Sequence, residues 1–149
     1  MTVSYDVFTS AFLAKVQEYR FLRMPEPTRR DLIDGYMYRT CAKFGEVCVY
    51  DIANGDDETR SFEFDGMTNG ELHEIIDIVS DGMVYQWMSA YMYKQENLEN
   101  TLTTGDYSAY SPAELTYRIT NAYENCRKKF VNAMREYSYR HGDISTLHL

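Results

Sequence analysis

The stretch SPAELTYRITNAYENCRKKFVNAMREYSYRHG, residues 111–142, carries the clearest helix signal in the chain. Ser111 is a suitable N-cap, Pro112 fits the first turn, and Glu114 stands where a capping box is completed. Gly142 is a residue type at which helices commonly stop. Apolar residues recur between these signals at helical spacing, at Leu115, Ile119, Ala122, Cys126, Phe130, Ala133 and Tyr137. The stretch therefore predicts one long amphipathic helix with a single buried stripe.

Three stretches before this one predict further helices. The first covers residues 5–19 and is ended by the prolines of RMPEPT. The second begins at Thr28 as N-cap and fades near residue 47, and the third begins at the capping box of Thr68 and Glu71. Their apolar stripes are Phe8, Ala11, Phe12, Val16 and Tyr19; Ile33, Met37, Cys41 and Phe44; and Leu72, Ile76, Val79, Met83, Trp87 and Ala90. Together the patterns predict a mainly α protein, a bundle of about four helices.

Residues 48–64 interrupt the helical pattern between the second and third helices. β-favouring residues lie on both sides of Asn54-Gly55, a dipeptide suited to a type I′ turn. A small β-hairpin and an irregular acidic insertion are both consistent with this composition. The acidic residues of 51–63 do not match a calcium loop: with Asp51 as the first ligand, Asp56 stands at the sixth position, where an EF-hand requires glycine.

Composition and charge narrow the class of protein. The chain has 149 residues, a mass of 17.5 kDa and a net charge of −8, as expected of one acidic globular domain. Such a charge argues against indiscriminate binding to nucleic acid. The predicted helix of residues 112–141 is locally basic, and its candidate DNA-binding or partner face consists of Arg118, Arg127, Lys128, Lys129 and Arg135. An ordinary solvated helix face is the simpler interpretation of these cations.

No catalytic, metal or cofactor signature stands out. The three cysteines form no CxxC pair, and His73, His141 and His148 lack a second ligand at zinc spacing. Phosphate loops, nucleophile elbows and HExxH are missing from the sequence. Paired carboxylates, such as Asp77 with Asp81 or residues 71 and 74, are expected on exposed helix faces. We therefore expect no enzyme activity, no cofactor and no metal, and synthesis in the cytoplasm without a signal peptide or membrane span.

Two apolar segments suggest a surface for other chains. In MVYQWMSAYMY, residues 83–93, apolar residues surround most of the helix, so this helix is either central to the bundle or faces a second subunit. The segment DISTLHL, residues 143–149, follows the predicted helix stop at Gly142 and carries three aliphatic residues. It either caps its own chain or docks on a neighbour. The candidate interface residues are Trp87, Met88, Tyr91, Tyr93, Ile144, Leu147 and Leu149.

Several segments resemble the head–tail connector proteins in the neck of tailed bacteriophages. They are YDVFTSAFLAKVQEYRFL, RRDLIDGYMYRTCAKF, QWMSAYMYKQENLENTLTTGDYSAYSPAEL and, most of all, MREYSYRHGDISTLHL. The resemblance implies a virion protein: a helical adaptor domain over residues 1–142 and a docking tail over residues 143–149. It also implies a ring, often of twelve copies, beneath the portal, with the tail of each copy docked on a neighbour or on the portal. The portal, tail or further neck proteins, and DNA passing unbound through a central channel are the implied partners.

Two other functions remain open at this stage. The basic face of the helix over residues 112–141 would suit a DNA-packaging or regulatory DNA-binding module, whose affinity would depend on salt. A small enzyme without recognisable motifs would need a deep polar pocket.

Overall fold

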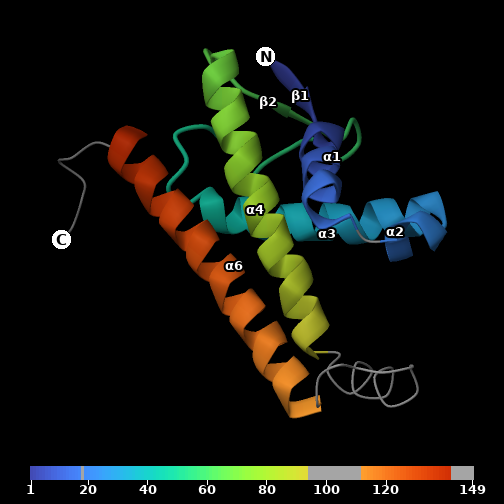
Figure 1. The fold of residues 1–149 in the computed structure, drawn as a ribbon. Helices are drawn as coiled ribbons and strands as arrows, with labels where there is room; N and C mark the ends of the chain where they lie inside the picture. Colours follow the sequence, from blue (N-terminus) through green and yellow to red (C-terminus); the bar gives the residue numbers. More distant parts are fainter. Residues whose placement is uncertain (18, 94–111, 142–149) are drawn as a thin grey trace.

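The computed structural model describes residues 1–17, 19–93 and 112–141 (Figure 1). Along the chain, they form β1 (Thr2–Ser4), α1 (Tyr5–Val16), α2 (Tyr19–Arg23), α3 (Glu26–Phe44), β2 (Ser61–Glu63), α4 (Asn69–Tyr93) and α6 (Pro112–His141). The predicted mainly α fold with a small insertion before the third long helix is confirmed. The predicted tail, residues 143–149, lies outside the described residues.

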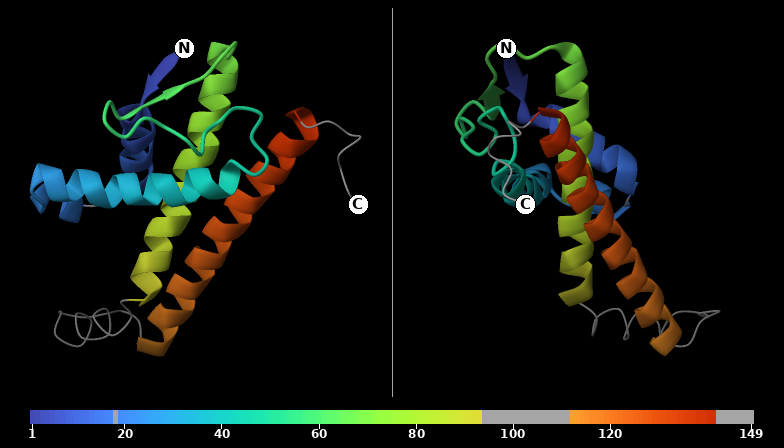
Figure 2. Two further views of the ribbon diagram at one scale, coloured as in Figure 1. Left: turned by 180° about the vertical axis from the view of Figure 1, so that it is seen from behind. Right: turned by 90° about the vertical axis from the view of Figure 1, so that its left-hand side faces the viewer.

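Helix α4 is the centre of the fold. It contacts α1, α3 and α6, with α1 on one side, α3 on the other and α6 running antiparallel beside it (Figure 2). Its first turn has the predicted capping box: the Thr68 hydroxyl accepts from the Glu71 backbone N–H at 3.2 Å, and the Glu71 carboxylate accepts from the Thr68 N–H at 3.2 Å. Ile75, Val79 and Met83 have no exposed area, and burial of each stabilises the fold by roughly 1.5–3 kcal/mol.

Gly82 allows three helices to meet at one point. A Cβ atom at this position of α4 would lie 2.7 Å from Cε1 of Phe130 on α6 and would also collide with Thr40 of α3. Such a contact is too short for carbon atoms, so a glycine is needed for the close approach. Gly35, which lies in a similar DG-containing sequence in α3, has no such neighbour: its Cβ would meet only Nη2 of Arg39, at 3.8 Å.

Helix α6 has the predicted length, and its apolar stripe is buried against α4 and α3 in its second half, whereas Ala122 in the first half is exposed. Phe130 and Tyr137 are almost fully buried, and the Tyr137 ring packs against Phe44 with 5.0 Å between ring centres. The Tyr137 hydroxyl also accepts a hydrogen bond from the Val49 backbone N–H at 3.3 Å, which attaches the chain after α3 to α6. The predicted N-cap, Ser111, and the predicted stop, Gly142, lie outside the described residues.

The predicted end of the first helix and the predicted start of the second are wrong. The first helix ends at Val16 because Gln17 adopts the left-handed conformation (φ 48°), and its N–H closes the last turn on the Leu13 carbonyl at 3.0 Å. The following α2 is separate. The next long helix starts at Glu26 and not at Thr28, because Pro25 forms the cap and a second proline fits the first turn, where a missing N–H is tolerated.

The β-hairpin turn expected at Asn54-Gly55 does not form. β2 pairs instead with β1 at the start of the chain, antiparallel, with Val3 opposite Phe62. Neither Asn54 nor Gly55 has the positive φ that a type I′ turn requires. Gly55 has a different role: a Cβ there would lie 2.9 Å from ring atoms of both Tyr5 and Phe62, so the two aromatic rings pack onto its backbone. Residues 48–60 therefore form the irregular insertion that was the alternative prediction.

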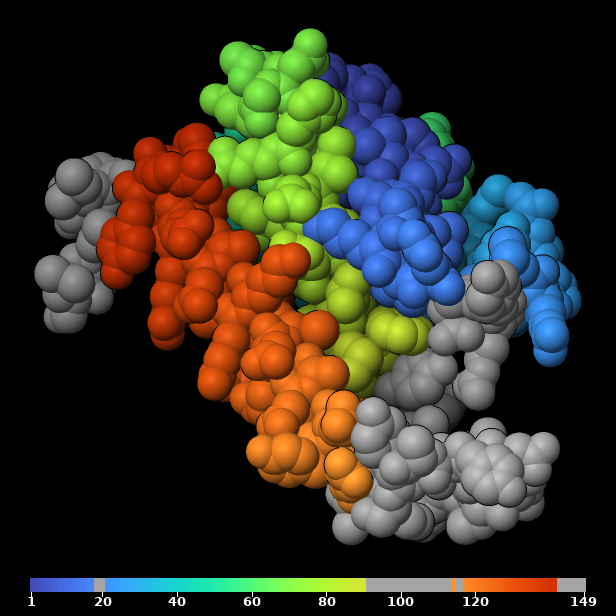
Figure 3. All heavy atoms as spheres, in the orientation of Figure 1, coloured from blue at the N-terminus to red at the C-terminus, as the bar shows by residue number. Residues whose placement is uncertain are grey.

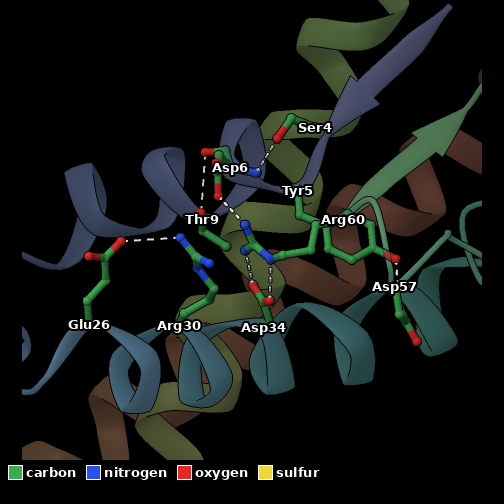
Figure 4. Close-up of polar contacts among 9 residues, drawn as sticks. All are labelled: Ser4, Tyr5, Asp6, Thr9, Glu26, Arg30, Asp34, Asp57 and Arg60. Atoms are coloured by element: carbon green, nitrogen blue, oxygen red, sulfur yellow. Dashed lines mark hydrogen bonds and ion pairs between the residues drawn. The ribbon is translucent and has the colours of Figure 1, made fainter.

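Arg60 fastens this insertion to two helices. Figure 4 shows its guanidinium between α1 and α3, where it donates to both oxygens of Asp34, at 3.0 and 2.7 Å, and to Asp6 at 2.7 Å. Asp34 is buried, with 7% of its side chain exposed. Nearby, the Tyr5 hydroxyl donates to Asp57 at 2.8 Å, and burial together with this carboxylate raises the pKa of Tyr5. The expected solvated acidic turn is thus partly held in place by ion pairs.

One end of the α4–α6 pair projects from the rest of the molecule. Beyond Gly82, α4 continues past α3, and the first half of α6 accompanies it (Figures 1 and 2). We call residues 84–93 and 112–126 the α4–α6 arm. Away from this arm, α6, α4 and α1 lie side by side, in that order, on the face seen in Figure 3.

Candidate partner-binding surface

The α4–α6 arm contains the first group of predicted interface residues. Trp87 and Met88 are half-buried, as are all residues from Val84 to Ala90. Trp87 packs against the edge of the core, so part of its surface is used within the chain. The first hypothesis for this segment, a helix central to the bundle, is supported, since α4 contacts α1, α3 and α6. The second, a face toward another subunit, stays a prediction.

The side chains of the other predicted interface residues lie outside the part of the chain that the structure describes. Tyr91 and Tyr93 belong to α4, but their side chains lie outside the described part of the structure. Ile144, Leu147 and Leu149 lie outside the described residues altogether. Trp87 and Met88 are thus the predicted interface residues whose side chains the structure describes.

A groove lies where α3 crosses the α4–α6 pair. Its volume is about 310 Å³, and it is lined by Lys43 of α3, Tyr85 and Gln86 of α4, and Arg127, Phe130, Val131 and Met134 of α6. The Tyr85 hydroxyl lies 3.2 Å from that of Tyr123, and this hydrogen bond, together with burial, raises the pKa of Tyr85 to about 12. Apart from Arg127, none of the lining residues was a predicted site residue, because the groove exists only once three helices cross.

The groove has cations at its border. Lys43 has no carboxylate partner among the described residues. Arg127 donates through Nε and Nη2 to Glu124, at 3.1 and 3.0 Å, which leaves other guanidinium donors available. The groove thus combines polar and apolar lining in similar amounts with a cationic border, which suits a segment that carries both a carboxylate and apolar side chains.

The rest of the predicted basic face is exposed but partly neutralised. Arg118 lies 3.8 Å from Glu114 and Lys129 lies 3.5 Å from Asp81. Lys128 and Arg135 are exposed and form no ion pair with any residue in the described ranges. The five predicted cations therefore lie on one helix, but they do not form a continuous unpaired stripe.

Asp81 was expected on an exposed helix face and is instead buried and structural, which corrects that prediction, whereas Asp77 is exposed as predicted. Lys15 of α1 lies 2.8 Å from an oxygen of each, and Asp81 is buried, with 7% of its side chain exposed. Burial alone would lower the pKa of Lys15, but the hydrogen bonds with Asp77 and Asp81 raise it above its usual value. Because Lys129 of α6 approaches the same Asp81, this cluster joins α1, α4 and α6.

Glu74 holds the end of α6. Arg140 Nη2 lies 2.5 Å from one of its oxygens and His141 Nε2 lies 3.1 Å from the other. Glu71 is likewise not a free surface group, since it accepts from the Tyr50 hydroxyl as well as from Thr68. These contacts fix the last described turn of α6 against the first turns of α4, so the chain leaves the body from a defined position.

The structure offers no metal or membrane site among the residues it describes. No group of three or more potential metal ligands occurs there, and His73 is exposed. No described helix combines the length and apolar character that a membrane span requires. Comparisons of the chain with protein-family models, curated proteins and solved structures find no match.

Proposed function

We propose that the protein is a non-enzymatic head–tail connector of a tailed bacteriophage. In this proposal, several copies, up to twelve, form a ring beneath the portal in the virion neck. Residues 143–149 of each copy dock on a neighbour or on the portal, and DNA passes through the ring. The four sequence segments that resemble neck connectors support the proposal, and so does the mainly helical body.

The α4–α6 arm is the observation that carries the proposal. The arm extends past α3, and in the single chain Trp87 and Met88 are half-buried while Tyr117 is 66% exposed. Each 100 Å² of apolar surface that a neighbour covered would contribute about 2.5 kcal/mol before ordering costs. A repeated contact of this kind around a ring gives tight assembly through avidity.

The ion pairs also favour a structural protein. The buried carboxylates Asp34 and Asp81 are each occupied by cations from other elements. They therefore join elements of the fold and are not free for acid–base work. A ring subunit needs such internal cross-links, because force on one surface must be carried through the body to the other.

The test compares the full-length protein with a variant that ends at Gly142. Docking on another chain predicts an unchanged melting temperature and a loss of assembly with the portal. Capping of its own body predicts a lower melting temperature. A triple variant, I144S with L147S and L149S, should lose assembly as fully as the truncated chain. The control variants S145A and T146A, which replace the polar residues between the aliphatic ones, should retain it. Assembly that survives the triple variant would remove the tail from the proposal.

DNA binding through α6 is the alternative function, favoured by the exposed Lys128 and Arg135. A DNA-binding module predicts affinity that falls steeply with salt and is reduced by K128E with R135E. The connector proposal predicts no stable complex with linear duplex DNA even at low salt, because the chain has a net charge of −8.

A further inference from the structure

The groove between α3, α4 and α6 has room for two aliphatic side chains. Its volume is about 310 Å³, whereas a dry cavity of about 150 Å³ is enough to hold a benzene ring. Val131 and Met134, both half-buried, offer apolar surface along α6, while Phe130, which also lines the groove, is almost fully buried. Lys43 and Arg127 supply positive charge from α3 and α6. A matching ligand would carry two neighbouring apolar side chains and a carboxylate beside them.

Residues 143–147 have this chemistry. Asp143 is followed directly by Ile144, and Leu147 comes three residues later. The aspartate can accept a charge-assisted hydrogen bond from Arg127 or Lys43, while the two aliphatic side chains cover the apolar surface of α6. The pattern of the segment therefore matches the groove in both charge and apolar character.

The segment of the same chain is poorly placed to reach this groove. Between Met134 and the end of α6, the helix is covered by Phe44 and by the chain at Cys48 and Val49, which contact Tyr137. Figure 2 shows this part of the insertion beside α6, near the end of α3. Glu74 also holds Arg140 and His141, so the chain leaves α6 on the far side of this obstruction.

We infer that the groove of one copy binds residues 143–147 of a second copy, with Asp143 at Arg127 and Lys43 and with Ile144 and Leu147 against Phe130, Val131 and Met134. This inference rests on the proposed function, since it gives the docking tail a site on the neighbouring subunit. The portal then contacts other surfaces of the ring.

Photo-cross-linking between isotope-labelled and unlabelled full-length chains tests the inference. A benzoylphenylalanine in place of Thr146, beside the two anchors, should cross-link to residues 127–134 of the other isotopic form. Cross-links within one isotopic form would show docking in the same chain and overturn the inference. Cross-links only to the portal, or to another surface of a neighbour, would overturn it as well.

Charge exchange provides the specific control. R127E should reduce the intermolecular cross-link about tenfold, the size expected for loss of one charge-assisted contact. D143R should reduce it similarly, and the combination R127E with D143R should restore it. K128E makes the same charge change on the exposed side of α6 and should have no effect. An R127E yield equal to that of K128E would contradict the assignment.

The mass of the assembly, measured in the same samples, separates the two proposals. A ring that persists without cross-links to the groove rejects this inference alone. A chain that stays monomeric both alone and with the portal rejects the connector proposal together with it.

Discussion

At the scale of single residues, Gly35 and Gly82, in the interiors of α3 and α4, have opposite roles despite similar sequence. Gly82 stands where Thr40, Phe130 and the α4 backbone meet, whereas Gly35 has only the end of the Arg39 side chain nearby. In a helix interior, glycine is less favourable than alanine by about 1 kcal/mol. The fold accepts this cost at Gly82 because no side chain fits there.

Replacing each glycine by alanine should therefore change the free energy of unfolding in opposite directions. G82A should lower the free energy of unfolding by about 1–3 kcal/mol through overpacking. G35A, the matched control, should raise it by up to about 1 kcal/mol, because its Cβ meets only the far end of Arg39. Urea unfolding measures both values, and equal effects would show that Gly82 is not a close contact between helices.

At the scale of elements, ion pairs decide how the insertion lies on the helices. Arg60 holds the buried Asp34 of α3 and the exposed Asp6 of α1. Arg30 and Glu26 form a similar pair, 3.2 Å apart, but on the exposed surface of α3. Removing one partner costs more stability in a buried pair than in an exposed one, because the carboxylate left behind in the buried pair cannot be solvated.

Replacing Arg60 by methionine should destabilise the protein by about 3–5 kcal/mol, because Asp34 would remain buried without its partner. R30M, the exposed control, should cost less than about 1 kcal/mol. Adding D34L to R60M should recover much of the loss, since no buried charge then remains. Unfolding free energies from urea titration test this, and a double variant as unstable as R60M would refute the explanation.

The elements also show which parts of the fold the sequence could predict. The helix over residues 112–141 and the capping box at Thr68 depend on neighbouring residues, so local patterns were sufficient. The pairing of β1 with β2 joins segments about sixty residues apart, and no local pattern encodes it. Gly55 misled the prediction because its lack of a side chain serves the packing of Tyr5 and Phe62, not a turn.

At the scale of the whole molecule, burial of thiol and phenol groups makes the free energy of unfolding fall at high pH. Burial raises the pKa of Cys41 from its usual 9.0 to about 12, and burial also raises the pKa of Tyr5 and of Tyr137. Above pH 9.0 the unfolded chain releases the Cys41 proton while the folded chain keeps it, so the folded state binds more protons. Stability is therefore fully present below pH 9.0 and is lost as the pH rises toward 12.

The expected slope is a loss of about 1.4 kcal/mol per pH unit for each such group. Urea midpoints measured with a reducing agent from pH 9.0 upward test this. C41A should have a shallower slope just above pH 9.0, because one of the three thiols whose pKa is raised in the folded chain, Cys41, Cys48 and Cys126, has been removed. A free energy of unfolding that stays constant over this range would contradict the assigned burial.

The candidate partner surface could be predicted less completely than the fold. Trp87 and Met88 could be named because an apolar circumference is visible in the sequence. Lys43, Tyr85 and Val131 could not, since they come from three helices whose crossing is not encoded in any local pattern. The glycine inside the predicted helix, Gly82, was the sequence signal for such a crossing.

Native mass spectrometry of the full-length protein mixed with the portal protein that the proposal implies tests the central claim most directly. The claim is that apolar area on the α4–α6 arm and in residues 143–149 is covered by other chains. We expect a complex that contains the portal and several 17.5 kDa copies. A portal of unchanged mass beside free 17.5 kDa chains would contradict the claim.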